Sequence, residues 1–121
     1  MSESHNLGKK GEDIAAGYLQ NKGYNIRHRN WKSGKRELDI VAENKDFIVF
    51  VEVKTRNEDF QMHPVSAVTS EKQRSMIYTA DSYVHKYNIN KESRFDVITI
   101  INKGKSSEID HIEDAFYPTL R

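Results

Sequence analysis

The segment that most constrains the fold runs from Phe47 to Lys54, where an apolar run is followed by alternating charges. Every residue from Phe47 to Val51 is apolar, and β-branched and aromatic types predominate, which indicates a strand covered on both faces. Because side chains alternate along a strand, Glu52 and Lys54 share one face at its polar end. This end of the strand is therefore the first candidate for a functional site.

The residues before this strand predict a hairpin with it. Apolar Leu38, Ile40 and Ala42 alternate along the chain, and Asn44-Lys45-Asp46 supplies turn residues. A two-residue loop at Lys45-Asp46 sets Asp39 opposite Glu52 and Glu37 opposite Lys54, whereas a three-residue loop shifts the register by one. Opposed Cα atoms lie about 4.5–5.5 Å apart, and two carboxylates at that distance repel unless one is protonated or a cation lies between them.

This pattern predicts metal-dependent phosphodiester hydrolysis. Magnesium takes oxygen ligands, commonly one or two protein carboxylates completed by waters and substrate phosphates, and Asp39 and Glu52 match that requirement. Lys54 is placed to position a water or to stabilise developing charge. A cross-strand ion-pair cluster with no catalytic role fits the same spacing, and the wider chain has to decide between them.

Several segments together resemble a known family. They resemble the uncharacterised bacterial YraN-like family of the PD-(D/E)xK restriction-endonuclease-like superfamily, which is similar to archaeal Holliday junction resolvases. The resemblance extends from Gly8 to about Phe116. Arg36 departs from the family pattern, because a glycine usually precedes the first acidic pair. The segments that carry the resemblance are Gly8–Ala15, Glu37–Val41, Phe50–Arg56, Lys72–Gln73 and Arg94–Val97.

The resemblance implies a nuclease core that uses Mg²⁺ or Mn²⁺. In such a core Asp39 and Glu52 would bind metal, and Lys54 would serve the nucleophilic water. Glu12 would complete the acidic cluster from the first helix. The implied activity is endonucleolytic hydrolysis of DNA, with branched or structured DNA as candidate substrates. The alternatives are a nucleic-acid-binding module that needs a partner protein for cleavage, and a structural adaptor with no saturable metal site.

Helical periodicity predicts two helices, one from about Leu7 to Leu19 that stops near Gly23, and one from Ser70 to Tyr87. Glu12 flanks the apolar stripe of the first helix, where it either reaches the sheet or stays an exposed acid near a helix N-terminus. Ser70 to Gln73 is typical of a capping box. Gln73 is therefore either a reciprocal cap of Ser70 or a site residue that hydrogen-bonds a water or phosphate.

A basic segment surrounds Trp31 on a strand predicted from Tyr24 to Trp31. Because the 19 basic and 18 acidic residues leave a net charge of only +1, nucleic-acid binding requires a local patch of this kind. An edge strand whose charges discourage further pairing is the competing interpretation. The candidate nucleic-acid contacts are Arg27, Arg29, Trp31, Lys32, Lys35 and Arg36, together with Arg56 and Lys72.

The rest of the chain completes an expected α/β fold. Arg94–Ile101 is expected to be a strand parallel to Phe47–Val51, because a helix precedes it, and Glu108–Ile112 a short edge strand. Asp96 is interpreted as structural, paired with Arg94 or with a backbone group. The fold predicted is a restriction-endonuclease-like core whose mixed central sheet, an antiparallel three-strand meander plus a crossover strand, is flanked by helices. A single domain is expected over residues 1–121, with its core at about 7–116.

Composition limits the remaining possibilities. The absence of cysteine excludes disulfides, thiolate zinc sites and a cysteine nucleophile, and it suits a reducing cytoplasm. No apolar run approaches the roughly 18 residues that span a bilayer, so no membrane contact is expected. The polar segment Arg56–Thr69 is expected to be a functional loop. We expect a cytoplasmic protein that binds DNA, as a monomer or as a homodimer.

Overall fold

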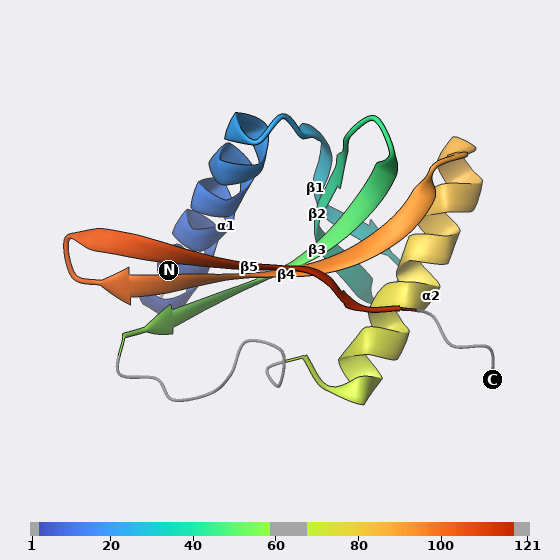
Figure 1. Cartoon of the computed structure of the whole chain (residues 1–121). Helices are drawn as coiled ribbons and strands as arrows, with labels where there is room; N and C mark the ends of the chain where they lie inside the picture. The colour runs from blue at the N-terminus through green and yellow to red at the C-terminus, as the bar shows by residue number, and fades with distance from the viewer. Residues whose placement is uncertain (1–2, 59–67, 118–121) are drawn as a thin grey trace.

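The computed structural model describes residues 3–58 and 68–117, which form two helices and one five-stranded sheet (Figure 1). In the sheet, β1 to β3 form an antiparallel meander, β3 and β4 are parallel, and β4 and β5 are antiparallel. This confirms the predicted mixed sheet with a helical crossover. The elements are α1 (Glu3–Asn21), β1 (Asn25–Ser33), β2 (Arg36–Glu43), β3 (Phe47–Asn57), α2 (Ser70–Tyr87), β4 (Glu92–Lys103) and β5 (Ser106–Phe116).

The two helices cover opposite faces of the sheet (Figure 1). On one face α1 packs Ala15 and Leu19 against residues such as Val49 and Val51. On the other face α2 packs Met76, Ala80 and Tyr83 against a group of strand residues that includes Leu38 and Phe50. The central strand is therefore apolar on both faces, as the run from Phe47 to Val51 predicted.

The β2–β3 hairpin has a two-residue loop, which is the first of the two alternatives that the sequence left open. The Asn44 backbone N–H donates to the Phe47 carbonyl at 3.0 Å, and the Asn44 side chain accepts from the N–H groups of Asp46 and Phe47. Backbone pairing runs from Glu43–Ile48 to Ile40–Val51 in the expected register and stops there. The predicted pairs Asp39–Glu52 and Glu37–Lys54 are thus not part of the ladder. Beyond Val51, β3 continues along β4 as far as Asn57, while β2 stays with β1.

Local features at the second helix and the last strand correct the sequence-based expectations. The N-cap of α2 is Thr69 rather than Ser70, and its hydroxyl accepts from the Lys72 N–H at 3.1 Å. The terminal strand β5 is eleven residues long and is not short, because it pairs along most of β4. Most of the expected loop between Arg56 and Thr69 lies outside the described residues. Neither described helix is long and apolar enough to cross a membrane.

The first helix approaches the central strand closely at Gly11. A Cβ placed on Gly11 would collide with the Thr55 hydroxyl and would lie 3.4 Å from the Thr55 Cβ. The absence of a side chain at Gly11 therefore lets α1 lie against β3 at this point. The consequence is that Glu12, the next residue, is brought to the end of the sheet where β2 and β3 separate.

Candidate functional site

The candidate site lies where the β2–β3 ladder ends. Asp39 immediately precedes Ile40, the last residue of β2 that pairs with β3 at this end, and its Oδ2 accepts a hydrogen bond from the Val53 backbone N–H at 2.9 Å. The carboxylate thus occupies the place where a β2 carbonyl would otherwise have paired. Its position is set by the separation of the strands, because regular pairing would have used the Val53 N–H.

Glu52 is the buried acid of the site, with 5% of its surface exposed. Lys54 Nζ lies 3.0 Å from its Oε2, and Lys72 Nζ lies 3.7 Å from its Oε1. Lys54 comes from the same strand, two residues along, whereas Lys72 comes from the first turn of α2. The two ammonium groups offset the cost of burying this carboxylate, since an unpaired buried charge is strongly destabilising.

The Asp39 carboxyl group is harder to ionise than an ordinary aspartate. Burial is the main cause, the negative charges of Glu52 and Glu12 add to it, and together they raise the pKa of Asp39 to about 7. The Val53 N–H and the ammonium of Lys72 act in the opposite direction. The carboxylates of Asp39 and Glu52 repel each other in a position shielded from water. A divalent cation bound between them would remove this repulsion, because such cations prefer oxygen ligands.

Glu12 reaches the same region from α1. Burial raises its pKa, and the nearby Glu37 and Asp13 contribute in the same direction. A hydrogen bond with Asn30 and the Arg29 guanidinium, 3.9 Å away, oppose that rise. Asn30 itself has a left-handed backbone with φ of 53° in β1, close to the end of the β2–β3 ladder. Glu12 is therefore an electrostatic neighbour of Asp39 held by partners of its own.

Asp39 interacts electrostatically with both of the other predicted metal ligands, Glu52 and Glu12. Across residues 3–58 and 68–117 there is no group of three or more His, Cys, Asp or Glu side chains that could hold a metal ion. Asp39, Glu52 and Glu12 are thus not arranged as a three-carboxylate centre. Two protein carboxylates are nonetheless the usual number for magnesium, which retains several waters.

The Gln73 side chain contacts the chain that precedes α2. Its Nε2 donates to the Val68 carbonyl at 3.1 Å, so the side chain stabilises the chain just before α2. It does not cap Ser70, because the N-cap is one residue earlier than predicted. Its backbone N–H donates to the Thr69 carbonyl at 2.9 Å.

The candidate nucleic-acid contacts near Trp31 are distributed over both faces of the sheet. Arg27 donates to the Tyr83 hydroxyl at 2.8 Å on the α2 side, whereas Arg29 pairs with Asp13 of α1 at 2.6 Å. A register shift between Ile26 and His28 in the β1–β2 pairing lets the side chains of Arg27 and Arg29 point to opposite faces of the sheet. Trp31 packs against Tyr83 and Tyr87, Lys32 pairs with Glu37, and Arg36 lies over the Tyr78 ring. Of the remaining candidates, Lys35 is exposed, Arg56 donates to the Thr55 carbonyl, and Lys72 contacts Glu52.

Thr99 is a neighbour of the site that the sequence did not reveal. It is the register partner of Lys54 in the parallel β3–β4 pair, so the two side chains share a face of the sheet. Only 4% of Thr99 is exposed, and its Oγ1 has no hydrogen-bond partner in the part of the chain that the structure describes. A buried hydroxyl without a partner is unusual, and a threonine within a β-branched strand carries no sequence signal of that kind.

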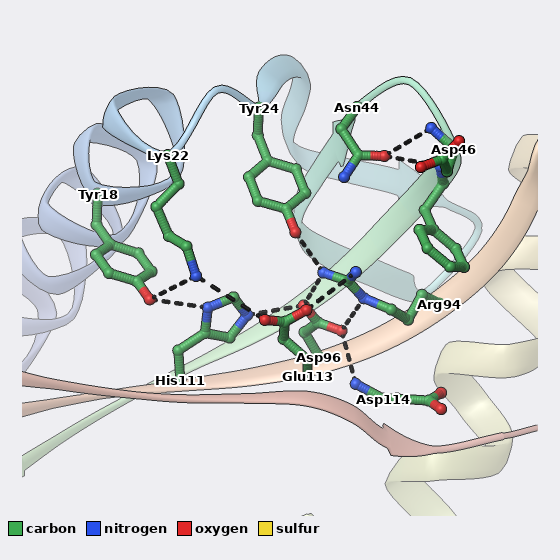
Figure 2. A network of polar contacts seen from close by, with 11 residues as sticks. Tyr18, Lys22, Tyr24, Asn44, Asp46, Arg94, Asp96, His111, Glu113 and Asp114 are labelled. Atoms are coloured by element: carbon green, nitrogen blue, oxygen red, sulfur yellow. Dashed lines mark hydrogen bonds and ion pairs between the residues drawn. The ribbon is translucent and has the colours of Figure 1, made fainter.

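A second polar cluster surrounds Asp96 on β4, at a different place in the sheet (Figure 2). Asp96 is fully buried and accepts from Arg94, from the His111 Nε2 at 2.7 Å and from the Asp114 backbone N–H at 3.0 Å. The predicted pairing of Asp96 with Arg94 or with a backbone group is confirmed, and both partners are present. The role of His111 was not foreseen, because its partners are far away in the sequence.

Comparison with known proteins identifies the family of this chain. The model of the uncharacterised protein family UPF0102 matches residues 11–100, which include every residue of the Asp39, Glu52 and Lys54 group. The chain belongs to the UPF0102 family. It is 47% identical over 120 residues to a UPF0102 protein of Phocaeicola vulgatus, covering 99% of both chains.

Other UPF0102 proteins match over similar lengths. A UPF0102 protein of Parabacteroides distasonis is 46% identical over 121 residues, with both chains covered completely. A UPF0102 protein of Flavobacterium psychrophilum is 39% identical over 117 residues, which is 97% of this chain and 98% of that protein. This membership supports the YraN-like resemblance and assigns no activity.

Proposed function

We propose that this UPF0102 protein is a Mg²⁺- or Mn²⁺-dependent endonuclease that hydrolyses DNA phosphodiester bonds. The observation that carries the proposal is the placement of Asp39, Glu52 and Lys54 together where β2 and β3 separate. The resemblance of this motif to the PD-(D/E)xK superfamily supports the same chemistry. Branched or structured DNA is the proposed substrate class.

Each residue of the site would have a separate role in phosphodiester hydrolysis. Asp39 and Glu52 would hold the divalent ion, which when bound supplies Lewis-acid polarisation of the phosphate and a water of lowered pKa. Lys54, 3.0 Å from Glu52, would orient the attacking water and stabilise charge on the phosphate. Lys72 would contact an oxygen of the bound phosphate, because its Nζ lies 3.7 Å from the Glu52 carboxylate that would hold the ion.

A second candidate function is DNA binding without intrinsic cleavage, with turnover supplied by a protein partner. It is favoured by one specific observation, the double pairing of Glu52 with Lys54 and Lys72. Two ammonium groups on one carboxylate weaken the need for a cation at that position. Titration with Mn²⁺ in the absence of DNA separates the two, because an endonuclease of this kind requires a saturable site that Asp39→Asn removes.

The decisive experiment is cleavage of labelled single-stranded, duplex, flap and four-way-junction DNA in Mg²⁺ or Mn²⁺. The native protein is compared with Asp39→Asn and Glu52→Gln, and Glu108→Gln is the control because Glu108 is an exposed acid whose ion pair within the described residues is with Lys103. We expect a loss of roughly a hundredfold or more for the first two variants and none for the control. Circular dichroism confirms that each variant is folded.

Each outcome has a defined meaning. Equal activity in all four proteins would identify a contaminating nuclease and overturn the proposal. Binding of DNA by every variant without cleavage of any substrate would favour the second candidate. Cleavage lost in Asp39→Asn and Glu52→Gln alone would support the endonuclease and would identify the DNA shape that it prefers.

A further inference from the structure

A pocket of about 720 Å³ lies beside α2, separate from the carboxylate cluster. Its wall on one side consists of α2 residues that include Arg74, Ile77 and Tyr78. On the other side it is bounded by Phe95 of β4 and by Tyr117, which follows β5. The volume falls within the range of pockets that bind small organic groups, about 300–1,000 Å³.

Exposed aromatic rings are concentrated at this pocket. Among the described residues the exposed large hydrophobic side chains are Tyr78, at 62%, and Tyr117, at 66%, and both of them line it. The sheet and helices bury their other large apolar side chains at least partly. Two tyrosines left accessible at one pocket indicate a surface that binds a ligand with a flat apolar face.

Cationic groups flank these rings. The Arg36 guanidinium lies over the Tyr78 ring, with its Cζ 4.4 Å from the ring centroid, and Arg74 also lines the pocket. The single acid among the lining residues is Asp81, which contacts His85 at 3.5 Å. The rim is therefore complementary to an anionic ligand. The contact with Arg36 fixes the orientation of the Tyr78 ring, on which a flat ligand can stack.

The second helix joins this pocket to the carboxylate cluster. Lys72 in its first turn lies 3.7 Å from Glu52, and Gln73 and Arg74, the next residues, line the pocket. Tyr78 is six residues beyond Lys72, about 9 Å along the helix axis at 1.5 Å per residue. A DNA strand that contacts Lys72 and continues along α2 for about 9 Å would reach the level of Tyr78.

We propose that this pocket binds an unpaired base of the DNA strand whose phosphodiester lies at Asp39, Glu52 and Lys54. The base stacks on Tyr78 and Tyr117, and Arg36 and Arg74 contact the flanking phosphates. The inference rests on the proposed endonuclease function and narrows its substrate to DNA with an unpaired stretch next to the bond that is cut. Fully paired DNA presents a base to the pocket less readily, because the base must first be unpaired and unstacked at a cost of about a few kcal/mol.

The test measures binding without turnover. Fluorescence anisotropy in EDTA, at one fixed ionic strength, compares a labelled single-stranded oligonucleotide with the matching duplex. The variants are Tyr78→Ala and Tyr117→Ala, and Tyr78→Phe is the control that keeps the ring. Because one stacked base contributes about 1–3 kcal/mol, each alanine variant should bind the single strand roughly fivefold to hundredfold more weakly. Tyr78→Phe should bind it about as well as the native protein, and duplex binding should not change.

The outcomes separate this proposal from the proposed function. Unchanged single-strand affinity in both alanine variants, or equal weakening for duplex and single strand, would overturn the pocket even if the protein cleaves DNA. A selective loss in a protein that never cleaves would support the pocket and refute the endonuclease. Light scattering is run in parallel, because a change in oligomeric state in Tyr78→Ala would show that a second copy of the chain occupies the pocket and would overturn the inference.

Discussion

Two aspartates of one sheet, Asp96 on β4 and Asp39 on β2, have pKa values that are shifted in opposite directions. Asp96 on β4 is surrounded by donors, since Arg94, His111 and the Asp114 N–H all donate to it (Figure 2). Asp39 on β2 accepts from the Val53 N–H and faces the carboxylate of Glu52. Burial opposes ionisation of both groups. The donors outweigh burial at Asp96 and hold its pKa below the ordinary range, whereas the pKa of Asp39 rises to about 7.

The difference is consistent with the proposed roles, in which Asp96 stabilises the fold and Asp39 belongs to the candidate site. The Asp96 cluster connects three elements, because His111 of β5 also contacts the Tyr18 hydroxyl of α1 at 3.0 Å. Since an ionised Asp96 can only accept, His111 donates to it from Nε2, and in the neutral tautomer that this requires Nδ1 accepts from the Tyr18 hydroxyl. Among the described residues Asp39 accepts from the Val53 N–H and has no donor set like that of Asp96, which is consistent with its proposed role in holding a cation.

The largest effect that tests this comparison is expected from Asp96→Ala. It leaves the Arg94 guanidinium buried without its main partner, which should cost about 3–5 kcal/mol of unfolding free energy. Urea denaturation measures the loss, and Glu108→Gln serves as the exposed-acid control. A loss below about 1 kcal/mol would mean that the cluster does not stabilise the fold.

The pH dependence of stability should have opposite signs at the two aspartates. The folded-state pKa of Asp39 lies above its ordinary value of 3.8, so the native state binds more protons than the unfolded state between that value and about 7. In EDTA this group therefore lowers stability as pH rises through that window, and Asp39→Asn should be more stable than the native protein at pH 8 by on the order of 2 kcal/mol. Asp96 acts oppositely, because its lowered pKa gives stability that is lost as pH falls below its ordinary value.

Denaturation of the native protein and of Asp39→Asn across this pH range checks the sign. Curves that stay parallel from pH 4 to pH 8 would show that Asp39 ionises normally. That result would remove the electrostatic basis for assigning it to a cation site.

A smaller effect is expected where α1 meets β3. Helix α1 carries both Glu12, beside Asp39, and Tyr18, beside the Asp96 cluster, and Gly11 sets its approach to the sheet. Gly11→Ala should destabilise by about 1 kcal/mol, because the clash with Thr55 exceeds the helix preference of alanine. In a Thr55→Ala background the same change should become neutral or slightly stabilising. A double-mutant cycle by thermal denaturation measures the coupling, and additive effects would show that the contact does not limit the approach.

The smallest effect is expected at two buried threonines that differ in pairing. Thr99 beside Lys54 has an Oγ1 without a partner among the described residues, while the Thr79 hydroxyl donates to the Ser75 carbonyl at 2.7 Å. Thr99→Val should raise stability by up to about 1 kcal/mol, and Thr79→Val should lower it by a similar amount. Urea denaturation of both variants tests the contrast. Destabilisation by Thr99→Val would show that its hydroxyl has a partner in the folded protein.

Much of this architecture could be predicted because its signals are local. The apolar run from Phe47 to Val51 and the turn at Asn44 predicted the hairpin and limited its register to two alternatives, and the helix before Arg94 predicted the parallel crossover. The length of β5 could not be predicted, because its polar residues are retained by pairing with β4. The dispersal of Arg27 and Arg29 to opposite faces follows from a register shift that has no sequence signature.

The sequence by itself determined the order of the elements and the side-chain types at the end of the central strand. Period and turn chemistry act over a few residues, so they can be read without knowledge of distant contacts. Only the tertiary structure decided that β2 and β3 separate beyond Val51, that Asp39 caps the Val53 N–H, and that Lys72 approaches Glu52. It also decided which aspartate is saturated with donors, because burial and pairing depend on residues brought together from distant parts of the chain.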